Sequence, residues 1–84
     1  HFVNLPLAVA NIKLSILFTE SEDEIHISLR SKDNLNVSKI SNKYFKGGGH
    51  KNAAGGKIFL KIDEIPDFIK HNIDKIIKIG NELD

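Results

Sequence analysis

Two runs of alternating apolar residues, separated by a short acidic stretch, constrain the fold of this 84-residue chain most strongly. In residues 12–19 an apolar side chain returns at every second position, and the same alternation returns in residues 25–30. A period of two is typical of a β-strand with one buried and one exposed face. Residues 20–24 are polar and acidic, so the sequence predicts an antiparallel β-hairpin.

The middle of the chain predicts a short helix and a third strand. Asn36 is the expected N-cap of a helix from Val37 to about Phe45, which three glycines end. Its inward side chains would be Val37, Ile40 and Tyr44. Residues 57–62 alternate again and predict a strand whose core-facing residues are Ile58, Leu60 and Ile62.

A longer amphipathic helix is expected at the carboxyl end. Asp63 would cap it, Pro66 is tolerated in its first turn, and Gly80 is the expected C-cap. Apolar side chains recur there at the i, i+3, i+4 spacing of a helix face, at Ile65, Phe68, Ile69, Ile73, Ile76 and Ile77. The order of elements predicts an α/β (α+β) domain, a small mixed sheet with a hairpin packed against two or three helices.

The first residues carry a weaker pattern. Residues 1–11 contain Pro6 and show no clear period, so we expect either an edge strand or the end of an inter-domain connection, with one domain over residues 12–84. The chain has no methionine and begins with His1, so we interpret it as a domain of a longer protein.

Composition excludes several classes of protein. The chain has no cysteine, which excludes a disulfide scaffold, a Cys-ligated zinc site and thiol catalysis. No run approaches the roughly 18 apolar residues of a membrane span, and no signal peptide opens the chain. We therefore expect a soluble, cytoplasmic protein that does not bind membranes.

The net charge of +1 hides an uneven distribution. Residues 30–57 hold seven cationic side chains against Asp33 alone, and the rest of the chain holds five lysines against ten acidic residues. A central basic segment between acidic ends favours a local anionic ligand. A chance cluster of solvated lysines remains the alternative on charge alone.

The glycine-rich segment 46–55 is the most informative stretch for chemistry. Three consecutive glycines are costly to order, at roughly 0.5–1 kcal/mol each relative to alanine, so we expect them where the backbone turns sharply or approaches a ligand. Their N–H groups could converge on an anion, and a short helix expected after His50 would add its positive N-terminus. A helix C-cap and flexible loop with an incidental histidine is the alternative, since no P-loop or dinucleotide fingerprint is present.

Arg30 ends a strand on its polar face and is the only arginine beside eleven lysines. Its guanidinium can grip a phosphate with two parallel hydrogen bonds, and a solvated or salt-bridged arginine is the alternative. The other histidines, His1, His26 and His71, are expected on the surface. The sequence shows no acid–base pair, nucleophile–base pair or metal cluster, so we assign no catalytic and no metal-binding residue.

Two motifs at this spacing resemble a known family. Ser28-Leu29-Arg30-Ser31 is followed by a short helix and then by the run FKGGGHKNAAGG over residues 45–56. This pair is similar to the DHHA1 domain, the C-terminal substrate-binding domain of DHH-family phosphoesterases, and most similar to the bacterial oligoribonuclease (nanoRNase) and pAp-phosphatase branch. The resemblance spans nearly the whole chain and implies that residues 12–84 are such a domain.

The resemblance implies a two-domain enzyme. An N-terminal DHH domain would bind two manganese ions that activate water, while this domain holds short RNA or a nucleotide phosphate. The D-H-H motif is absent here, so we expect this fragment to hold no cofactor and to be inactive alone. The full-length protein could form a homodimer.

The family also implies roles for particular residues. Arg30 would grip a substrate phosphate, and His50 would contact the phosphate or the nucleotide near the scissile bond. Backbone donors would come from Gly47, Gly48 and Gly49, and weaker, supporting roles would fall to Ser28 and Ser31. Two residues depart from the family pattern: Lys46 stands where glycine or asparagine is common, and Ser41 replaces a small apolar residue, which we expect to have no consequence.

Two further functions remain open. One is the substrate domain of a cyclic-dinucleotide phosphodiesterase. The other is a non-catalytic single-stranded nucleic-acid or tRNA-binding module, which predicts a long groove with stacking aromatic residues. Only Tyr44, Phe45 and Phe59 lie near the basic segment, and Tyr44 is expected to face inward, so this module is disfavoured. A purely structural module would leave the three glycines unexplained.

Overall fold

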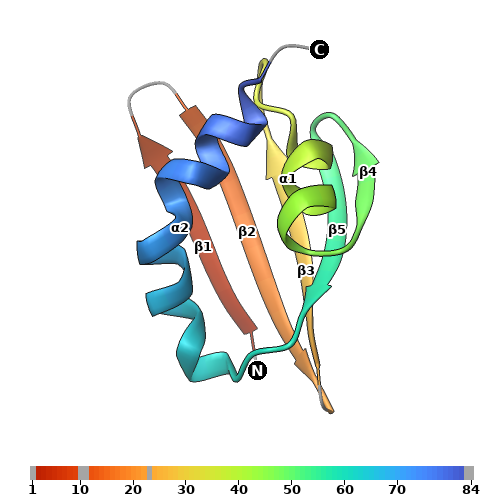
Figure 1. Cartoon of the computed structure of the whole chain (residues 1–84), viewed down its shortest axis with the longest axis vertical. Coiled ribbons are helices and arrows are strands. Elements are labelled where there is room, and N and C mark those ends of the chain that lie inside the picture. The colour runs from red at the N-terminus through yellow and green to blue at the C-terminus, as the bar shows by residue number, and fades with distance from the viewer. Residues whose placement is uncertain (1, 10–11, 23, 83–84) are drawn as a thin grey trace.

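The chain is described by a computed structural model that covers residues 2–9, 12–22 and 24–82. These residues form one five-stranded sheet, two α-helices and a short 3₁₀ helix (Figure 1). In chain order the elements are β1 (Phe2–Val9), β2 (Ile12–Ser21), β3 (Glu24–Ser31), α1 (Val37–Tyr44), β4 (Gly48–His50), β5 (Ala53–Ile58), η1 (Ile62–Glu64) and α2 (Ile65–Gly80).

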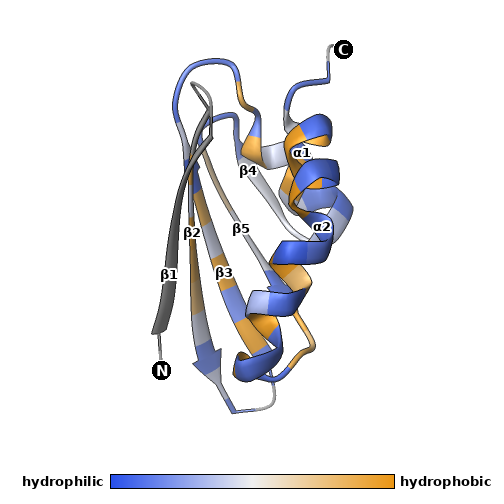
Figure 2. Cartoon of the chain, turned by 90° about the vertical axis from the view of Figure 1, so that its left-hand side faces the viewer, coloured by the Kyte–Doolittle hydropathy of each residue, from blue (hydrophilic) through white to orange (hydrophobic). Residues whose placement is uncertain are grey.

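The strands lie in the order β1-β2-β3-β5-β4, and each neighbouring pair is antiparallel. This confirms the expected α/β (α+β) domain with a hairpin and helices on a small sheet, but the sheet is not mixed in the described strands. Both β3 and β4 are antiparallel to β5, which lies between them. β3 and β4 therefore run in the same direction but are not paired with each other. Both helices cover the same face of the sheet and leave the other face without a helix (Figure 2).

The predicted β2–β3 hairpin is confirmed. Opposite residues include Ile16 and Leu29, and Phe18 and Ile27, all of which are buried beneath the helices. Alternate residues of β3 are exposed, as a period of two requires. The side chain of Ile12 lies outside those that the structure describes. Residues 2–9 form β1 at the edge of the sheet, and residues 1, 10 and 11 lie outside the described ranges.

The short helix begins where the sequence predicts. The side chain of Asn36 accepts a hydrogen bond from the backbone N–H of Lys39 at 3.2 Å, and α1 follows directly. Val37 and Ile40 are fully buried as expected, but Tyr44 is only half-buried. Phe45 fills the core instead, because the chain leaves the helix at this residue and turns its ring toward Phe68, 6.1 Å away between ring centroids.

The segment after His50 differs from the expectation. A strand, not a short helix, follows it: β5 begins at Ala53 and ends at Ile58, whereas we predicted a strand over residues 57–62. The run Ala-Ala-Gly-Gly gives no contrast between apolar and polar positions, so its alternation is hidden in the sequence. Its small residues are nevertheless required there, since Ala54 is buried where β5 pairs with β3. The partly buried side chains of Ile58, Leu60 and Ile62 contact the core as predicted.

The carboxyl-terminal helix is confirmed with two changes at its ends. Asp63 lies in η1 and does not cap α2, whose N-cap is Glu64, while Pro66 occupies the first turn as predicted. Gly80 is the last helical residue and Asn81 is the C-cap. A Cβ on Gly80 would lie 2.5 Å from Leu35 Cδ1, so this glycine makes room for a core side chain.

The apolar face of α2 is also largely as predicted. Ile65, Ile69 and Ile76 are buried, and the half-buried Phe68 and Ile73 pack against the core. Ile77 is half-buried but is not part of this contact, and Ile79, which we did not predict, packs against the core instead. Neither described helix combines the length and the apolar character that a membrane crossing requires.

The first prediction concerns Gly56 of β5. A Cβ at this position would overlap the carbonyl oxygen of Phe45, and backbone cannot move aside cheaply. Gly56→Ala should therefore lower the free energy of unfolding by about 1–3 kcal/mol, measured by urea denaturation. The matched control is Gly48→Ala, because a Cβ on Gly48 meets nothing within 4 Å. Equal stability of the two variants would contradict this account.

Candidate functional site

Arg30 and His50, far apart in the sequence, lie in one row across three strands. Arg30 of β3 is opposite Ala53 of β5, and Ala53 is opposite His50 of β4. Directly opposite residues of antiparallel strands point to the same face. Arg30 and His50 are both exposed, whereas Leu29 beside Arg30 is buried under the helices. Two strand spacings place the Cα atoms of Arg30 and His50 about 10 Å apart.

The next row on this face carries almost no side chains. Ser28 of β3 is opposite Gly55 of β5, which is opposite Gly48 of β4. A Cβ on Gly48 would meet nothing within 4 Å, and one on Gly55 would meet only the carbonyl oxygen of Ile27 at 3.3 Å. We call the side of the sheet without helices the open face; around the site it is made of Ser28, Arg30, Gly48, His50, Ala53 and Gly55.

The fold constrains the three consecutive glycines in different ways. A Cβ on Gly47 would overlap the carbonyl oxygen of Gly55. Gly49 has a φ of +152°, which other residues rarely adopt, and a Cβ there would lie 2.6 Å from the carbonyl oxygen of Ala53. Gly48 has neither constraint. The fold thus requires Gly47 and Gly49, whereas no contact in the fold explains Gly48.

The expected anion nest at a helix N-terminus is wrong in its geometry. No helix follows His50, because β4 and β5 form a hairpin with β4 at the edge of the sheet. The backbone N–H of Gly47 donates to the carbonyl oxygen of Ser41 at 3.2 Å, so it is already used. Backbone groups of β4 that point away from β5 face no further strand of the sheet. Contact of Gly48 and Gly49 with a phosphate stays a prediction, with both glycines in an edge strand and not in a loop before a helix.

The guanidinium of Arg30 is well placed to meet an anion. Nη1 donates to the carbonyl oxygen of Leu29 at 2.9 Å, which orients the guanidinium. Its other N–H groups remain as donors for another acceptor. No ion pair of Arg30 is found among residues 2–9, 12–22 and 24–82. The side chains of His26 and Lys57 are different, because Glu24 contacts them at 3.1 Å and 3.7 Å.

The two serines of the motif have unlike surroundings. Ser28 is exposed on the open face opposite Gly55. Ser31 is half-buried: its hydroxyl donates to the carbonyl oxygen of Leu35 at 2.6 Å and accepts from Asn52 Nδ2 at 3.0 Å. Ser31 is therefore engaged in holding loops together, and Ser28 is the serine that a ligand could reach.

Ser41 has a role that the sequence analysis missed. It is fully buried, its hydroxyl donates to the carbonyl oxygen of Gly55, and its carbonyl oxygen accepts from the N–H groups of Phe45 and Gly47. We expected no consequence from a serine here, but it joins α1 to β5 directly beneath the glycine row. A polar residue four positions after Val37, on the inward face of the predicted helix, was the available signal.

The central lysines do not gather around Arg30 and His50. Lys51 Nζ donates to Asn34 Oδ1 at 3.1 Å, and Lys39 Nζ donates to the carbonyl oxygen of Glu82 at 2.7 Å. Lys46 Nζ lies 5.6 Å from the ring centroid of Phe59. The positive charge of residues 30–57 is therefore spread over several elements rather than focused on one site.

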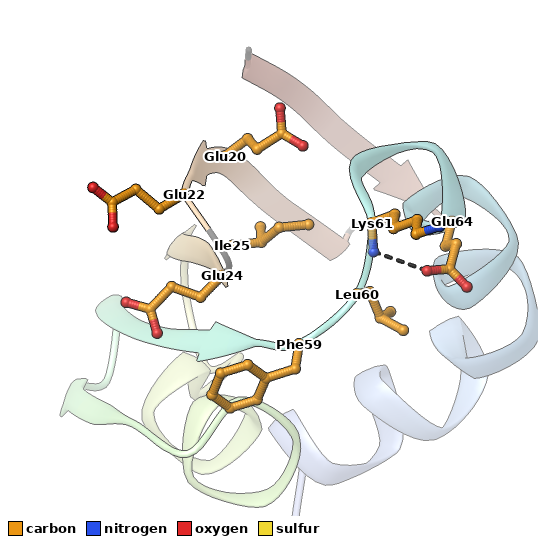
Figure 3. A pocket seen from close by; sticks show the side chains of 8 residues that line it. All are labelled: Glu20, Glu22, Glu24, Ile25, Phe59, Leu60, Lys61 and Glu64. Atoms are coloured by element: carbon orange, nitrogen blue, oxygen red, sulfur yellow. Dashed lines mark hydrogen bonds between the residues drawn. The ribbon is translucent and has the colours of Figure 1, made fainter.

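A hollow of about 410 Å³ lies at the opposite end of the sheet, by the turn between β2 and β3. Figure 3 shows its lining of four carboxylates, three apolar side chains and one lysine, which are Glu20, Glu22, Glu24, Glu64, Ile25, Phe59, Leu60 and Lys61. Glu64 accepts from the backbone N–H of Lys61 at 2.8 Å. This acidic hollow disfavours phosphate, so the shallow row on the open face is the better candidate. In the described part of the chain, no group of three or more His, Asp or Glu could hold a metal ion.

Comparison with known proteins identifies the family. The family model of the DHHA1 domain matches residues 1–78. This chain belongs to the DHHA1 domain family. Among curated proteins, the bifunctional oligoribonuclease and PAP phosphatase NrnA of Mycoplasma genitalium is 41% identical over 89% of this chain and 23% of its own length. An uncharacterized protein of Methanocaldococcus jannaschii is 49% identical over 67% of the chain and 12% of its own length.

Other DHHA1 relatives carry related names. The 3′,5′-cyclic-nucleotide phosphodiesterase of Helicobacter pylori is 52% identical over 39% of this chain and 10% of its own length. The crystal structure of an exopolyphosphatase-related protein from Bacteroides fragilis superposes with a TM-score of 0.68 at 29% identity, covering 82% of this chain and 20% of that one. This DHHA1 domain spans less than a quarter of the length of each of these proteins.

The second prediction tests the bond beneath the glycine row. Ser41→Ala removes the hydroxyl and leaves the carbonyl oxygen of Gly55 without this partner, so the free energy of unfolding should fall by about 1–3 kcal/mol. Urea denaturation measures the change, and Ser28→Ala is the matched control because Ser28 is exposed. If Ser41→Ala is as stable as Ser28→Ala, Ser41 does not hold α1 to β5.

Proposed function

We propose that this chain is the nucleotide-phosphate-binding domain of a manganese-dependent DHH phosphoesterase that degrades short oligoribonucleotides, dephosphorylates 3′-phosphoadenosine 5′-phosphate (pAp), or both. The observation that carries the proposal is the row of Arg30, Ala53 and His50 beside the bare positions Gly48 and Gly55. The first row supplies groups for a phosphate, and the second lets the rest of a nucleotide lie against the backbone.

The chemistry of the row suits one phosphate group. Arg30 offers planar N–H donors and a permanent charge, and His50 offers a ring N–H from the other side of Ala53. The methyl group of Ala53 is small enough to leave space between the two side chains. A phosphate bound there would be held from two strands, β3 and β4, while its nucleoside extends over Gly48 and Gly55.

The names of the relatives support the same class of ligand. An oligoribonuclease, a PAP phosphatase and a cyclic-nucleotide phosphodiesterase all act on phosphate esters of nucleotides. The relative named as oligoribonuclease and PAP phosphatase aligns with far more of this chain than the cyclic-nucleotide phosphodiesterase does. We therefore favour linear short substrates over cyclic ones.

In this proposal the chain's own residues bind and orient, and the hydrolytic metals lie elsewhere. The described residues do not fit a manganese site, so we derive no hydrolytic step from them. A DHH domain that precedes this one in the same polypeptide would supply two manganese ions to activate water. A cytoplasmic location and a homodimeric full-length enzyme stay predictions.

A non-catalytic module for long single strands fits the surface less well. Such modules stack successive bases on exposed aromatic side chains. Among residues 14–22 and 24–82, whose side-chain exposure the structure describes, Phe59 is the exposed large hydrophobic residue, with 64% of its surface accessible. It borders the acidic hollow with Glu22 and Glu24, where a phosphate backbone would be repelled.

The third prediction is that the open face binds nucleotides selectively. A ¹H–¹⁵N NMR titration with pAp and with 5′-phosphorylated diadenylate should give saturable shifts at Arg30, Gly48 and His50 that sulfate does not reproduce. Gly48→Ala should weaken nucleotide affinity about tenfold, about 1.4 kcal/mol, because a methyl group intrudes where the nucleoside lies. Its stability should not fall, because nothing lies within 4 Å.

Phe59→Ala is the matched control, because it removes an exposed side chain next to the acidic hollow. It should leave pAp affinity unchanged. A nucleotide response identical to that of sulfate, or full affinity in Gly48→Ala, would contradict the proposal. Tighter binding of a cyclic dinucleotide than of both linear ligands would move the assignment to the cyclic-dinucleotide branch, and loss of long-strand binding in Phe59→Ala would favour the non-catalytic module.

A further inference from the structure

The two-residue turn between β4 and β5 is bonded to the end of β3. Asn52 Nδ2 donates to Ser31 Oγ at 3.0 Å and to the carbonyl oxygen of Asp33 at 3.3 Å. The carbonyl oxygen of Asn52 accepts from the backbone N–H of Ser31 at 3.1 Å. Ser31 directly follows Arg30, and the turn directly follows His50. One pair of residues therefore joins the strand of Arg30 to the turn of His50.

The loop between β3 and α1 completes this connection. The Ser31 hydroxyl passes a hydrogen bond on to the carbonyl oxygen of Leu35 at 2.6 Å, and the carbonyl oxygen of Lys51 accepts from the N–H of Val37 at 2.7 Å. The hydroxyl of Ser31 thus accepts from Asn52 and lies within hydrogen-bond distance of a second acceptor besides Leu35, the carbonyl oxygen of Lys51 at 3.5 Å. Both hydrogens of the Asn52 amide have partners as well, in Ser31 and Asp33.

The strand of His50 needs such support more than the strand of Arg30. β3 is paired on both sides, with β2 and β5, whereas β4 is three residues long and pairs only with β5. His50 stands at the turn end of this edge strand. Its position relative to Arg30 depends on how firmly the turn is held.

We infer that Asn52 is a positioning residue that sets the spacing between His50 and Arg30 through Ser31, and with it the affinity for a ligand that touches both. This inference rests on the proposed function. A ligand that spans two groups loses affinity when their spacing is loosened, because binding must then order them. A small anion that touches one group at a time is far less sensitive.

The fourth prediction uses Asn52→Gly, which removes the side-chain donors, adds no charge and suits a turn. Affinity for pAp should fall about fivefold, as expected for loss of one or two hydrogen bonds that act through a neighbour, while affinity for sulfate changes less than about twofold. In a His50→Ala background the same substitution should have no further effect on pAp affinity. NMR titrations of the four proteins measure this cycle.

The matched control is Asn34→Gly, the same change at a nearby exposed asparagine that contacts only the tip of Lys51 among the hydrogen bonds of the described residues. It should leave pAp affinity unchanged. If Asn52→Gly is unfolded, Ser31→Ala removes the other partner of the same bond and should give the same fivefold loss and the same dependence on His50.

Four outcomes are decisive. Unchanged pAp affinity in a folded Asn52→Gly would overturn the positioning role, and so would a loss that persists undiminished in the His50→Ala background. If the wild-type chain is folded but binds no nucleotide, the proposed function fails first and the inference falls with it. If Asn52→Gly loses affinity for pAp and for sulfate equally, Asn52 supports the fold in general and does not set the spacing between His50 and Arg30.

Discussion

The close approach of α1 to β5 is the constraint on which the rest of this structure depends. Ser41 donates across the gap to the carbonyl oxygen of Gly55, and the N–H of Lys57 donates to the carbonyl oxygen of Phe45 at 2.6 Å. β5 has no room for a side chain at Gly56, where a Cβ would overlap Phe45 and Ser41. This packing explains the small residues on the buried side of β5. It does not explain those on the other side, where Gly55 and Ala53 face solvent. β5 therefore carries small residues on both of its sides. Ala53 and Gly55, on the open face, leave the backbone of β5 accessible there.

The sequence predicts the parts of the fold where large apolar side chains mark the period, and misses those where they do not. The β2–β3 hairpin, the Asn36 cap and the face of α2 were all predicted, because isoleucine, leucine and phenylalanine contrast with polar neighbours. β5 was placed too late because alanine and glycine carry no such contrast. Arg30, His50 and the glycines were chosen from the sequence and given roles by the family resemblance, but their common row follows from strand register. Ser41 and Asn52 were missed because their partners lie 14 and 21 residues away, a distance that no local pattern spans.

The two ends of the sheet differ in charge, although the net charge of the chain is small. The central excess of lysine suggested a basic patch, yet Lys57 is paired with Glu24, and Lys51 and Lys39 bond to loops and the end of α2. One end of β3 carries Arg30, and the other borders a hollow rich in carboxylates. A ligand with phosphate groups is therefore favoured at one end of the sheet and opposed at the other. Such a surface suits a short anionic ligand better than a strand that runs the length of the domain.

The two groups of the candidate site are held with unequal firmness, and this asymmetry has a chemical meaning. Arg30 projects from a strand with neighbours on both sides, and its guanidinium is oriented by the carbonyl oxygen of Leu29. His50 projects from a short edge strand, and the turn that follows it is held by hydrogen bonds between Asn52 and Ser31. Under the proposed function, an anion would be anchored on the rigid side, and the contact from His50 would depend on a few hydrogen bonds. Discrimination between ligands of different length would then depend less on the side chains that touch them than on the turn behind His50.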